Sequence, residues 1–136
     1  MRAILQLLTL FIVTSHCIYA DEFRFSREIV LKKDEQTKIL VKYAKNSKLF
    51  KFRWTLYVNK GLVVLKSYDQ IVSQNILYLR HENQSVRIDL MPKGARDYRV
   101  PYFILKFKEF DYTTNSAKFD LLLSDEEMQV SLDFLK

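Results

Sequence analysis

Few residues of this 136-residue chain have the types and spacing that chemistry requires. His81 is the only histidine after position 16, and no His-x-x-x-His or Asp-x-Asp spacing accompanies it. A transition-metal site here would therefore need carboxylates for its other ligands. Asp125, Glu126 and Glu127 are adjacent in a turn, so they cannot face each other across a cleft as the paired carboxylates of glycosidases do. We expect these four side chains to be solvated, with no metal and no cofactor.

Nucleophilic catalysis has equally little support in the sequence. No Gly-x-Ser-x-Gly element is present, and two glycines are too few for a phosphate-binding loop. The single cysteine, Cys17, lies close to the N-terminus. These features predict a non-enzymatic protein with no catalytic residues. The alternative is a small hydrolase whose polar groups converge only in three dimensions.

Basic residues carry the strongest of the weak binding signals. The net charge is +6, and the segment between Gln36 and Tyr68 has eight cations and no acid. Cations interleaved with aromatic residues can bind a phosphate-rich partner. This pattern predicts a basic binding face made by Lys45, Lys48, Lys51 and Arg53. The competing interpretation is that lysines keep a β-face soluble and prevent edge pairing.

A second candidate is the polar connection over 91–101. It places Arg96, Tyr98 and Arg99 together, and Arg and Tyr are enriched at binding hot spots. Loops on a rigid scaffold often carry recognition, so this loop is a second predicted binding site. A plain surface connection is the alternative.

The N-terminus has the parts of a secretory signal peptide. Arg2 gives a positive start, an apolar run follows over 3–13, and a small residue, Ala20, precedes Asp21. The run is shorter than the roughly 20 residues that a membrane-spanning helix needs. We therefore expect residues 1–20 to be a signal peptide and residues 21–136 to be one exported domain without a transmembrane segment.

Cys17 permits a second interpretation of this region. Bacterial lipoprotein signals end before a cysteine that becomes acylated, but His16 fits the position before that cysteine poorly. The bias toward lysine, phenylalanine, isoleucine and leucine is typical of an AT-rich bacterial genome. We expect a periplasmic protein, with secretion or lipid anchoring through Cys17 as alternatives.

Alternating polar and apolar residues predict β-structure throughout 21–136. One face of the clearest strand holds Phe50, Phe52, Trp54, Leu56 and Val58. A hairpin loop follows at 59–61, where Gly61 is expected to adopt the left-handed conformation. The segment 69–75 is ambiguous between strand and a short helical turn that crosses between two sheets. A shift of aromatic phase predicts a β-bulge near 108–109.

About eight short strands with alternating faces indicate a sandwich of two antiparallel sheets. The pattern resembles an immunoglobulin-like sandwich, because Trp54 on an early strand occupies the place of a large aromatic core residue. A small β-barrel is the alternative fold.

These features together predict an exported domain that binds an envelope protein or an anionic envelope lipid or polymer. The alternatives are the hydrolase above and a structural subunit or lipoprotein of an envelope assembly. We expect no nucleic-acid partner.

Overall fold

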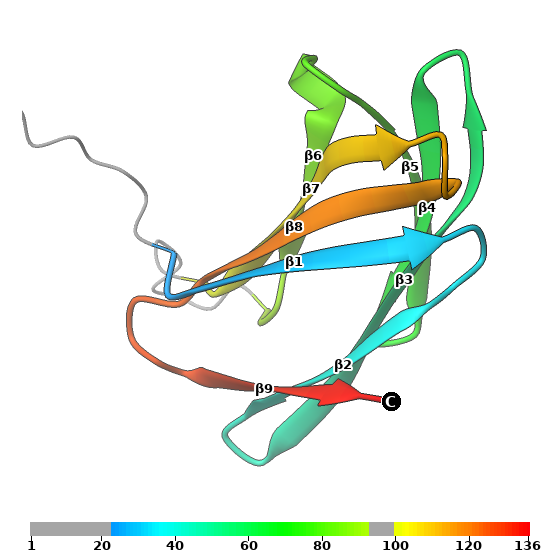
Figure 1. Ribbon diagram of the computed structural model, residues 1–136. Coiled ribbons are helices and arrows are strands. Elements are labelled where there is room, and N and C mark those ends of the chain that lie inside the picture. The colour runs from blue at the N-terminus through cyan, green and yellow to red at the C-terminus, as the bar shows by residue number, and fades with distance from the viewer. Residues whose placement is uncertain (1–22, 93–99) are drawn as a thin grey trace, which may run out of the picture.

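The computed structural model describes residues 23–92 and 100–136, and this part of the chain forms two packed antiparallel sheets (Figure 1). The strands are β1 (Phe25–Lys32), β2 (Thr37–Tyr43), β3 (Asn46–Val58), β4 (Gly61–Tyr68), β5 (Ile71–Tyr78), β6 (Ser85–Asp89), β7 (Tyr102–Asp111), β8 (Ser116–Ser124) and β9 (Val130–Leu135). A single 3₁₀ turn, η1 (Glu82–Gln84), precedes β6. The predicted two-sheet sandwich is confirmed. None of the helical structure within the described ranges is long and apolar enough to cross a bilayer.

Two meanders supply most of the strands. Sheet A has the order β1-β8-β7-β6, and sheet B has the order β5-β4-β3-β2-β9. The layered architecture is that of immunoglobulin-like sandwiches, but β2 to β5 form one continuous meander, whereas immunoglobulin domains distribute consecutive strands between both sheets. The sheets do not close into the alternative barrel. The strands β1, β6, β5 and β9 are therefore the edges of the two sheets that the described residues form.

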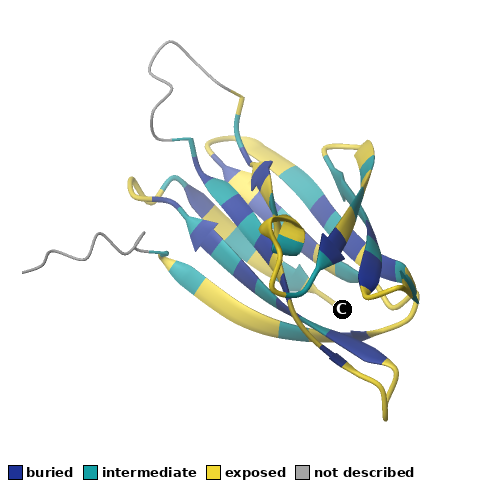
Figure 2. Cartoon of the chain, turned by 90° about the horizontal axis from the view of Figure 1, so that it is seen from above, coloured by how far each residue is buried: buried dark blue, intermediate teal, exposed yellow. Residues whose placement is uncertain are grey.

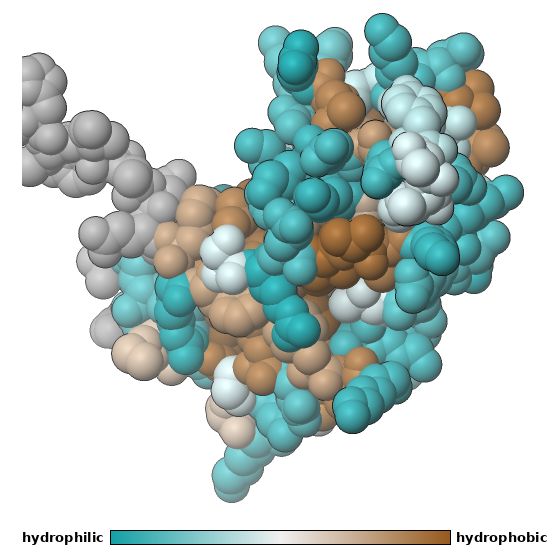
Figure 3. All heavy atoms as spheres, in the orientation of Figure 1, coloured by the Kyte–Doolittle hydropathy of each residue, from teal (hydrophilic) through white to brown (hydrophobic). Residues whose placement is uncertain are grey.

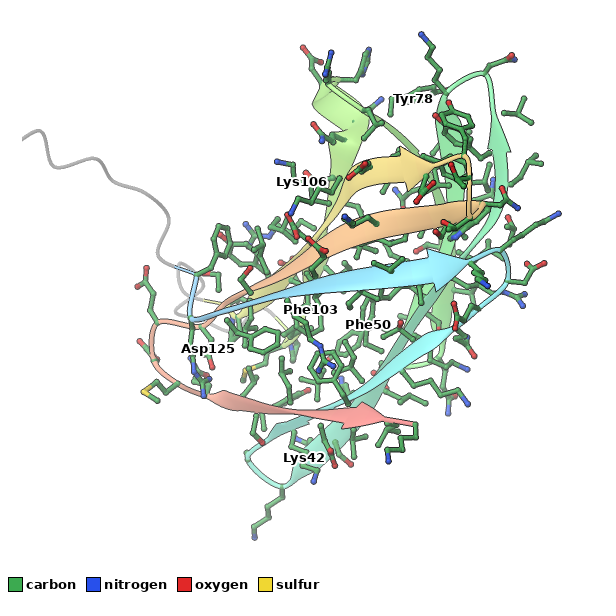
Figure 4. All side chains as sticks on the ribbon, in the orientation of Figure 1. Lys42, Phe50, Tyr78, Phe103, Lys106 and Asp125 are labelled. Carbon is green, nitrogen blue, oxygen red and sulfur yellow. The ribbon has the colours of Figure 1, made fainter. Side chains whose placement is uncertain are left out.

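The core lies between the sheets and is built from every second residue of most strands. Figure 2 shows this alternation as bands of buried and exposed residues along the strands. Phe50 of sheet B and Phe103 of sheet A point toward one another, and their ring centroids are 5.2 Å apart (Figure 4). Both side chains are fully buried. Full burial of a phenylalanine contributes about 1.5–3 kcal/mol, so such pairs hold the two sheets together.

Along one side, between β1 and β9, hydrophobic side chains reach the surface within a hydrophilic rim (Figure 3). Phe25 of β1 and Phe134 of β9 meet there, with ring centroids 5.8 Å apart. The Arg27 guanidinium lies over the Phe134 ring at 4.1 Å. This cation–π contact covers the apolar seam while the charge stays in water.

Trp54 is buried in the core, as its place in the pattern predicts. Its indole Nε1–H donates a 2.8 Å hydrogen bond to the Leu31 carbonyl, which joins β3 to β1 of the opposite sheet. The register with β4 then shifts between Trp54 and Leu56. This bulge reverses the faces of β3, so Tyr57 turns inward and stacks on Phe110 at 4.0 Å. The prediction that Leu56 and Val58 point inward is wrong, since both are about half exposed.

The turn before β4 also differs from the prediction. Asn59 and Lys60 have positive φ and form a two-residue turn, whereas the φ of Gly61 is not positive. A side chain at Gly61 would meet the Tyr78 ring at 3.0 Å, so this glycine permits close strand packing rather than a left-handed turn. The twist of the flanking strands favours this turn type.

Two further expectations are decided by strand register. Segment 69–75 does not cross between sheets, because Asp69 and Gln70 form a tight turn of positive φ and β5 pairs directly with β4. The crossing instead follows β5, through η1. The predicted bulge near 108–109 is confirmed by a register shift between Phe107 and Glu109.

Candidate binding surface

The outer face of sheet B carries part of the predicted basic face. Lys51 and Arg53 alternate with buried Phe50 and Phe52 on β3, so both side chains point away from the core. They line an open groove of about 250 Å³ on this face. The groove is completed by Gln36, Leu65, Lys66, Ser67 and Val72. Neither Lys51 nor Arg53 has an ion-pair partner within the described residues, so both charges remain available to a ligand.

Lys48 and Lys45 are not part of this groove. Lys48 pairs in register with buried Val41, so its side chain starts from the inner side of sheet B. Its Nζ lies 2.9 Å from the Asp69 carboxylate and 5.9 Å from the Tyr43 ring centroid. Hydrogen bonds with Asp69 and Tyr43 raise the pKa of Lys48. Lys48 therefore ties β3 to the β4–β5 turn, while Lys45 lies in the β2–β3 turn.

Lys38 is a basic residue of this face that the sequence reasoning missed. It lies directly opposite Lys51 in the β2–β3 register and is exposed. Its alternation with the buried Ile39 and Val41 indicates that Lys38 points outward, and this could be predicted from the sequence. Only the pairing of β2 with β3 places Lys38 beside Lys51. Lys42, farther along β2, is partly neutralised by Asp133 of β9 at 3.8 Å.

The outer face of sheet A has a different charge arrangement. Lys108 contacts Glu28 at 2.8 Å and Asp120 at 3.7 Å. Lys118 contacts Glu28 at 3.7 Å and Glu109 at 3.5 Å. The Lys108 hydrogen bond lowers the pKa of Glu28, so this carboxylate stays charged and paired. Sheet A thus neutralises the charges of Lys108 and Lys118, whereas the groove on sheet B has no acids beside Lys51 and Arg53 among the residues that the structure describes.

Exposed apolar residues adjoin the groove. Val72 of β5 is 71% exposed and Ile76 is 45% exposed, and both lie on the outer face of sheet B. The β3 bulge adds Leu56 and Val58 to the same face. An exposed apolar cluster beside unpaired cations is typical of an interaction surface. The sequence reasoning placed Leu56 and Val58 in the core because it did not predict the bulge.

A second polar site lies between the sheets, where β5 and β6 leave the sandwich open. This cleft of about 250 Å³ is lined by Phe50, Lys66, Tyr68, Ile71, Ser73, Arg87, Ile88 and Asp89. Lys66 is half-buried on the inner side of β4, and its Nζ donates a short hydrogen bond to the Ser73 hydroxyl. Burial lowers the pKa of Lys66. An inward-facing lysine beside a serine escaped the sequence analysis, because only the register of β4 with β5 places Lys66 opposite Ser73.

His81 and Asp125 of the acidic turn both make hydrogen bonds within the described part of the chain. His81 is exposed before η1, and its Nδ1 accepts a 3.4 Å hydrogen bond from the Asn83 amide. The expectation of a solvated turn is wrong for Asp125, which is buried and lies 2.5 Å from the Arg24 guanidinium. Its carboxylate also accepts hydrogen bonds from the Gln129 and Val130 amides. Asp125 therefore closes the β8–β9 loop. Within 23–92 and 100–136, no group of acids and histidines could hold a metal.

The predicted loop residues Arg96, Tyr98 and Arg99 lie outside the described residues, as do the signal peptide and Cys17. Comparisons with protein families, curated proteins and solved structures found no match to this chain. Its function is therefore inferred from its own residues and their geometry.

Proposed function

We propose that this chain is a non-enzymatic periplasmic binding domain that attaches to an anionic surface of the bacterial envelope. The contact surface is the outer face of sheet B around the Lys51–Arg53 groove. One observation carries the proposal: these cations have no ion pairs within the described part of the chain, while the opposite face pairs Lys108 and Lys118 with acids. The envelope location rests on the signal-peptide pattern over 1–20.

The chemistry of the groove favours phosphate or carboxylate groups. Arg53 can form two parallel hydrogen bonds to such a group, and Lys51 supplies a compact point charge two residues away on the same face. Lys38 extends the positive strip onto β2. The exposed Val72 and Ile76 give apolar contact beside the charges, which suits a lipid headgroup region better than a fully hydrated polymer.

A matched pair of variants tests the proposal. K51Q/R53Q removes two cations from the groove, and K32Q/K106Q removes two exposed cations from the opposite face, where Figure 4 labels Lys106. Each cation near an anionic membrane contributes about 1 kcal/mol, so K51Q/R53Q should bind anionic vesicles about 30-fold more weakly. The control variant should bind like the wild type.

The measurement is co-sedimentation with vesicles of phosphatidylglycerol and phosphatidylcholine, with neutral vesicles as the blank. A soluble anionic polysaccharide in a parallel titration distinguishes a polymer from a lipid surface. An equal loss of vesicle binding in both double variants would show that only net charge matters, and it would refute the proposal that the groove is the binding site. Absence of binding to both anionic probes would refute the function.

The cleft gives a specific reason to keep the hydrolase as a second candidate. A neutral lysine beside a serine can accept the hydroxyl proton, as the base does in serine–lysine enzymes. Lys66 contacts the Ser73 hydroxyl, and burial lowers the pKa of Lys66, which increases its neutral fraction at a given pH. Activated esters are the test substrate. Hydrolysis that rises with pH and is lost in S73A, but not in the outer-face control S67A, would support an enzyme. Equal rates in the wild type and S73A would exclude Ser73 as a nucleophile.

A further inference from the structure

Strand β5 is an open edge with an unusual composition. Its sequence is IVSQNILY, which has no charge, no proline and no glycine. The register with β4 runs through all eight residues without a bulge. Ile71 and Val72 are more than 70% exposed. Charges, prolines and bulges are the devices that normally keep an edge strand from pairing, and β5 has none of them.

The other three edges do have such devices. β1 carries Arg27, Glu28 and Lys32, β6 is short and carries Arg87 and Asp89, and β9 is short and carries Asp133. The absence of protection is therefore confined to one of the four edges that the described strands form. An edge without such devices leaves its backbone groups free to pair with another strand.

The residues of β5 are arranged symmetrically about Gln74. In an antiparallel pair of two β5 strands centred there, Gln74 opposes its own copy and Val72 opposes Ile76. On the inner side, Ser73 opposes Asn75, and Ile71 opposes Leu77 in the same register. Every apolar residue from 71 to 77 thus meets an apolar residue, and every polar residue meets a polar one. Directly opposed side chains of matching type stabilise a sheet.

We propose that β5 pairs with β5 of a second copy of this chain, with the two-fold axis at Gln74. The two five-stranded sheets then form one continuous sheet of ten strands. Such an interface is isologous, because each copy contributes the same surface. A self-complementary strand favours a second copy over an unrelated peptide, because an unrelated sequence has no reason to match this palindromic pattern.

Asn75 supports this register. Its Oδ1 is buried and has no hydrogen-bond partner within the described residues. Buried polar atoms are nearly always satisfied, so an orphaned carboxamide oxygen needs an explanation. In the proposed dimer Ser73 of the second copy lies opposite Asn75, and rotation of the Asn75 carboxamide would turn its buried Oδ1 toward that hydroxyl. Ser73 accepts a hydrogen bond from Lys66 in its own chain, so its hydroxyl hydrogen is free to donate across the pair.

Pairing would also double the binding surface, and this part rests on the proposed function. The two-fold axis of an antiparallel pair at an exposed edge is perpendicular to the sheet, so both outer faces point the same way. Two Lys51–Arg53 grooves would then approach one anionic surface together. Engagement of two linked sites increases avidity without any new contact.

The pairing has a salt dependence opposite to that of vesicle binding. Two copies of a chain with net charge +6 repel each other, and added salt screens that repulsion. The strand contact itself involves no charges. Dimerisation should therefore strengthen with salt, whereas attachment to anionic vesicles should weaken.

Sedimentation equilibrium of the full chain tests the proposal. The wild type should show a concentration-dependent shift from one chain to two. Q74K and Q74E each place like charges opposite each other on the axis, so each should dimerise at least 10-fold more weakly. An equimolar mixture of Q74K and Q74E should recover the dimer, because opposite charges then meet. V30K is the matched control, since Val30 is exposed on the edge strand β1 of the other sheet.

Three results would overturn the proposal: a wild type that stays monomeric at millimolar concentration in high salt, a Q74K variant that dimerises like the wild type, or a mixture that does not recover. Gln74 is exposed, so circular dichroism should show both variants folded. Sedimentation without vesicles reports on the dimer alone, and co-sedimentation of K51Q/R53Q with vesicles reports on the groove alone, so a failed dimer and a failed groove are distinguishable results.

Discussion

Replacement of Asp125 by alanine is the most direct test of how the β8–β9 loop is held. The Asp125 carboxylate is fully buried and accepts hydrogen bonds from the Gln129 and Val130 amides at 2.9 and 3.0 Å. It also pairs with Arg24, whose Nη1 reaches the Val130 carbonyl at 2.7 Å. The D125A variant leaves the buried Val130 amide without its acceptor and Arg24 without its counter-ion.

The expected loss of unfolding free energy in D125A follows from these contacts. A buried donor left unpaired costs about 1–3 kcal/mol. The Arg24 side chain is 35% exposed, so water solvates its charge when Asp125 is removed, and loss of the ion pair adds only about 0–1 kcal/mol. We expect D125A to lower the free energy of unfolding by about 3 kcal/mol, because these costs overlap at one carboxylate. With a urea m-value of about 2 kcal/mol/M, the unfolding midpoint should fall by about 1.5 M.

The assay is urea unfolding followed by fluorescence of Trp54, the only tryptophan. The matched control is D133A, because Asp133 is about half exposed and lies 3.8 Å from Lys42. Exposed pairs of this kind contribute about 0–1 kcal/mol. A D125A midpoint no lower than that of D133A would refute the reasoning that burial and backbone acceptance make Asp125 structural.

Three further predictions concern the core and the turns. Replacement of Trp54 by phenylalanine leaves the Leu31 carbonyl without its donor and a small cavity, so unfolding followed by circular dichroism should show a loss of about 2–4 kcal/mol. Burial, with the Tyr112 hydrogen bond, raises the pKa of Tyr57 to about 12. An unfolded tyrosine titrates near pH 10, so the unfolding free energy should fall as pH rises from about 10 to 12, and less steeply in Y57F. Alanine at Gly61 would press on the Tyr78 ring, so G61A should lose about 1–3 kcal/mol by urea unfolding, and the added Y78A substitution should remove that extra cost.

Much of the fold was predictable because the alternation of apolar residues is local. A residue such as Phe103 or Phe119 lies on the buried face of its strand whatever that strand pairs with, and both are fully buried. The bulge near 108–109 was predictable for the same reason, since it changes the phase of the pattern within one strand. The bulge after Trp54 was not predictable. Leu56 and Val58 are apolar and continue the alternation in the sequence, although the backbone shifts register between Trp54 and Leu56.

The candidate surface was only partly predictable. Lys51 and Arg53 follow from alternation on β3, but Lys38 joins them only through the pairing of β2 with β3. Lys48, next to them in sequence, faces the other side and pairs with Asp69. The sequence shows how many cations this segment contains, but only the strand register determines which of them share a face.

The sequence by itself determined the class of fold, the identity of most core residues and the excess of positive charge, since these depend on composition and on a period of two residues. Only the tertiary structure decided which cations have no ion pair among the described residues, that Lys66 meets Ser73, and that β5 is the last strand of its sheet. Ion pairs, clefts and edges join residues that are distant in the chain, and their positions depend on how the strands are ordered and aligned.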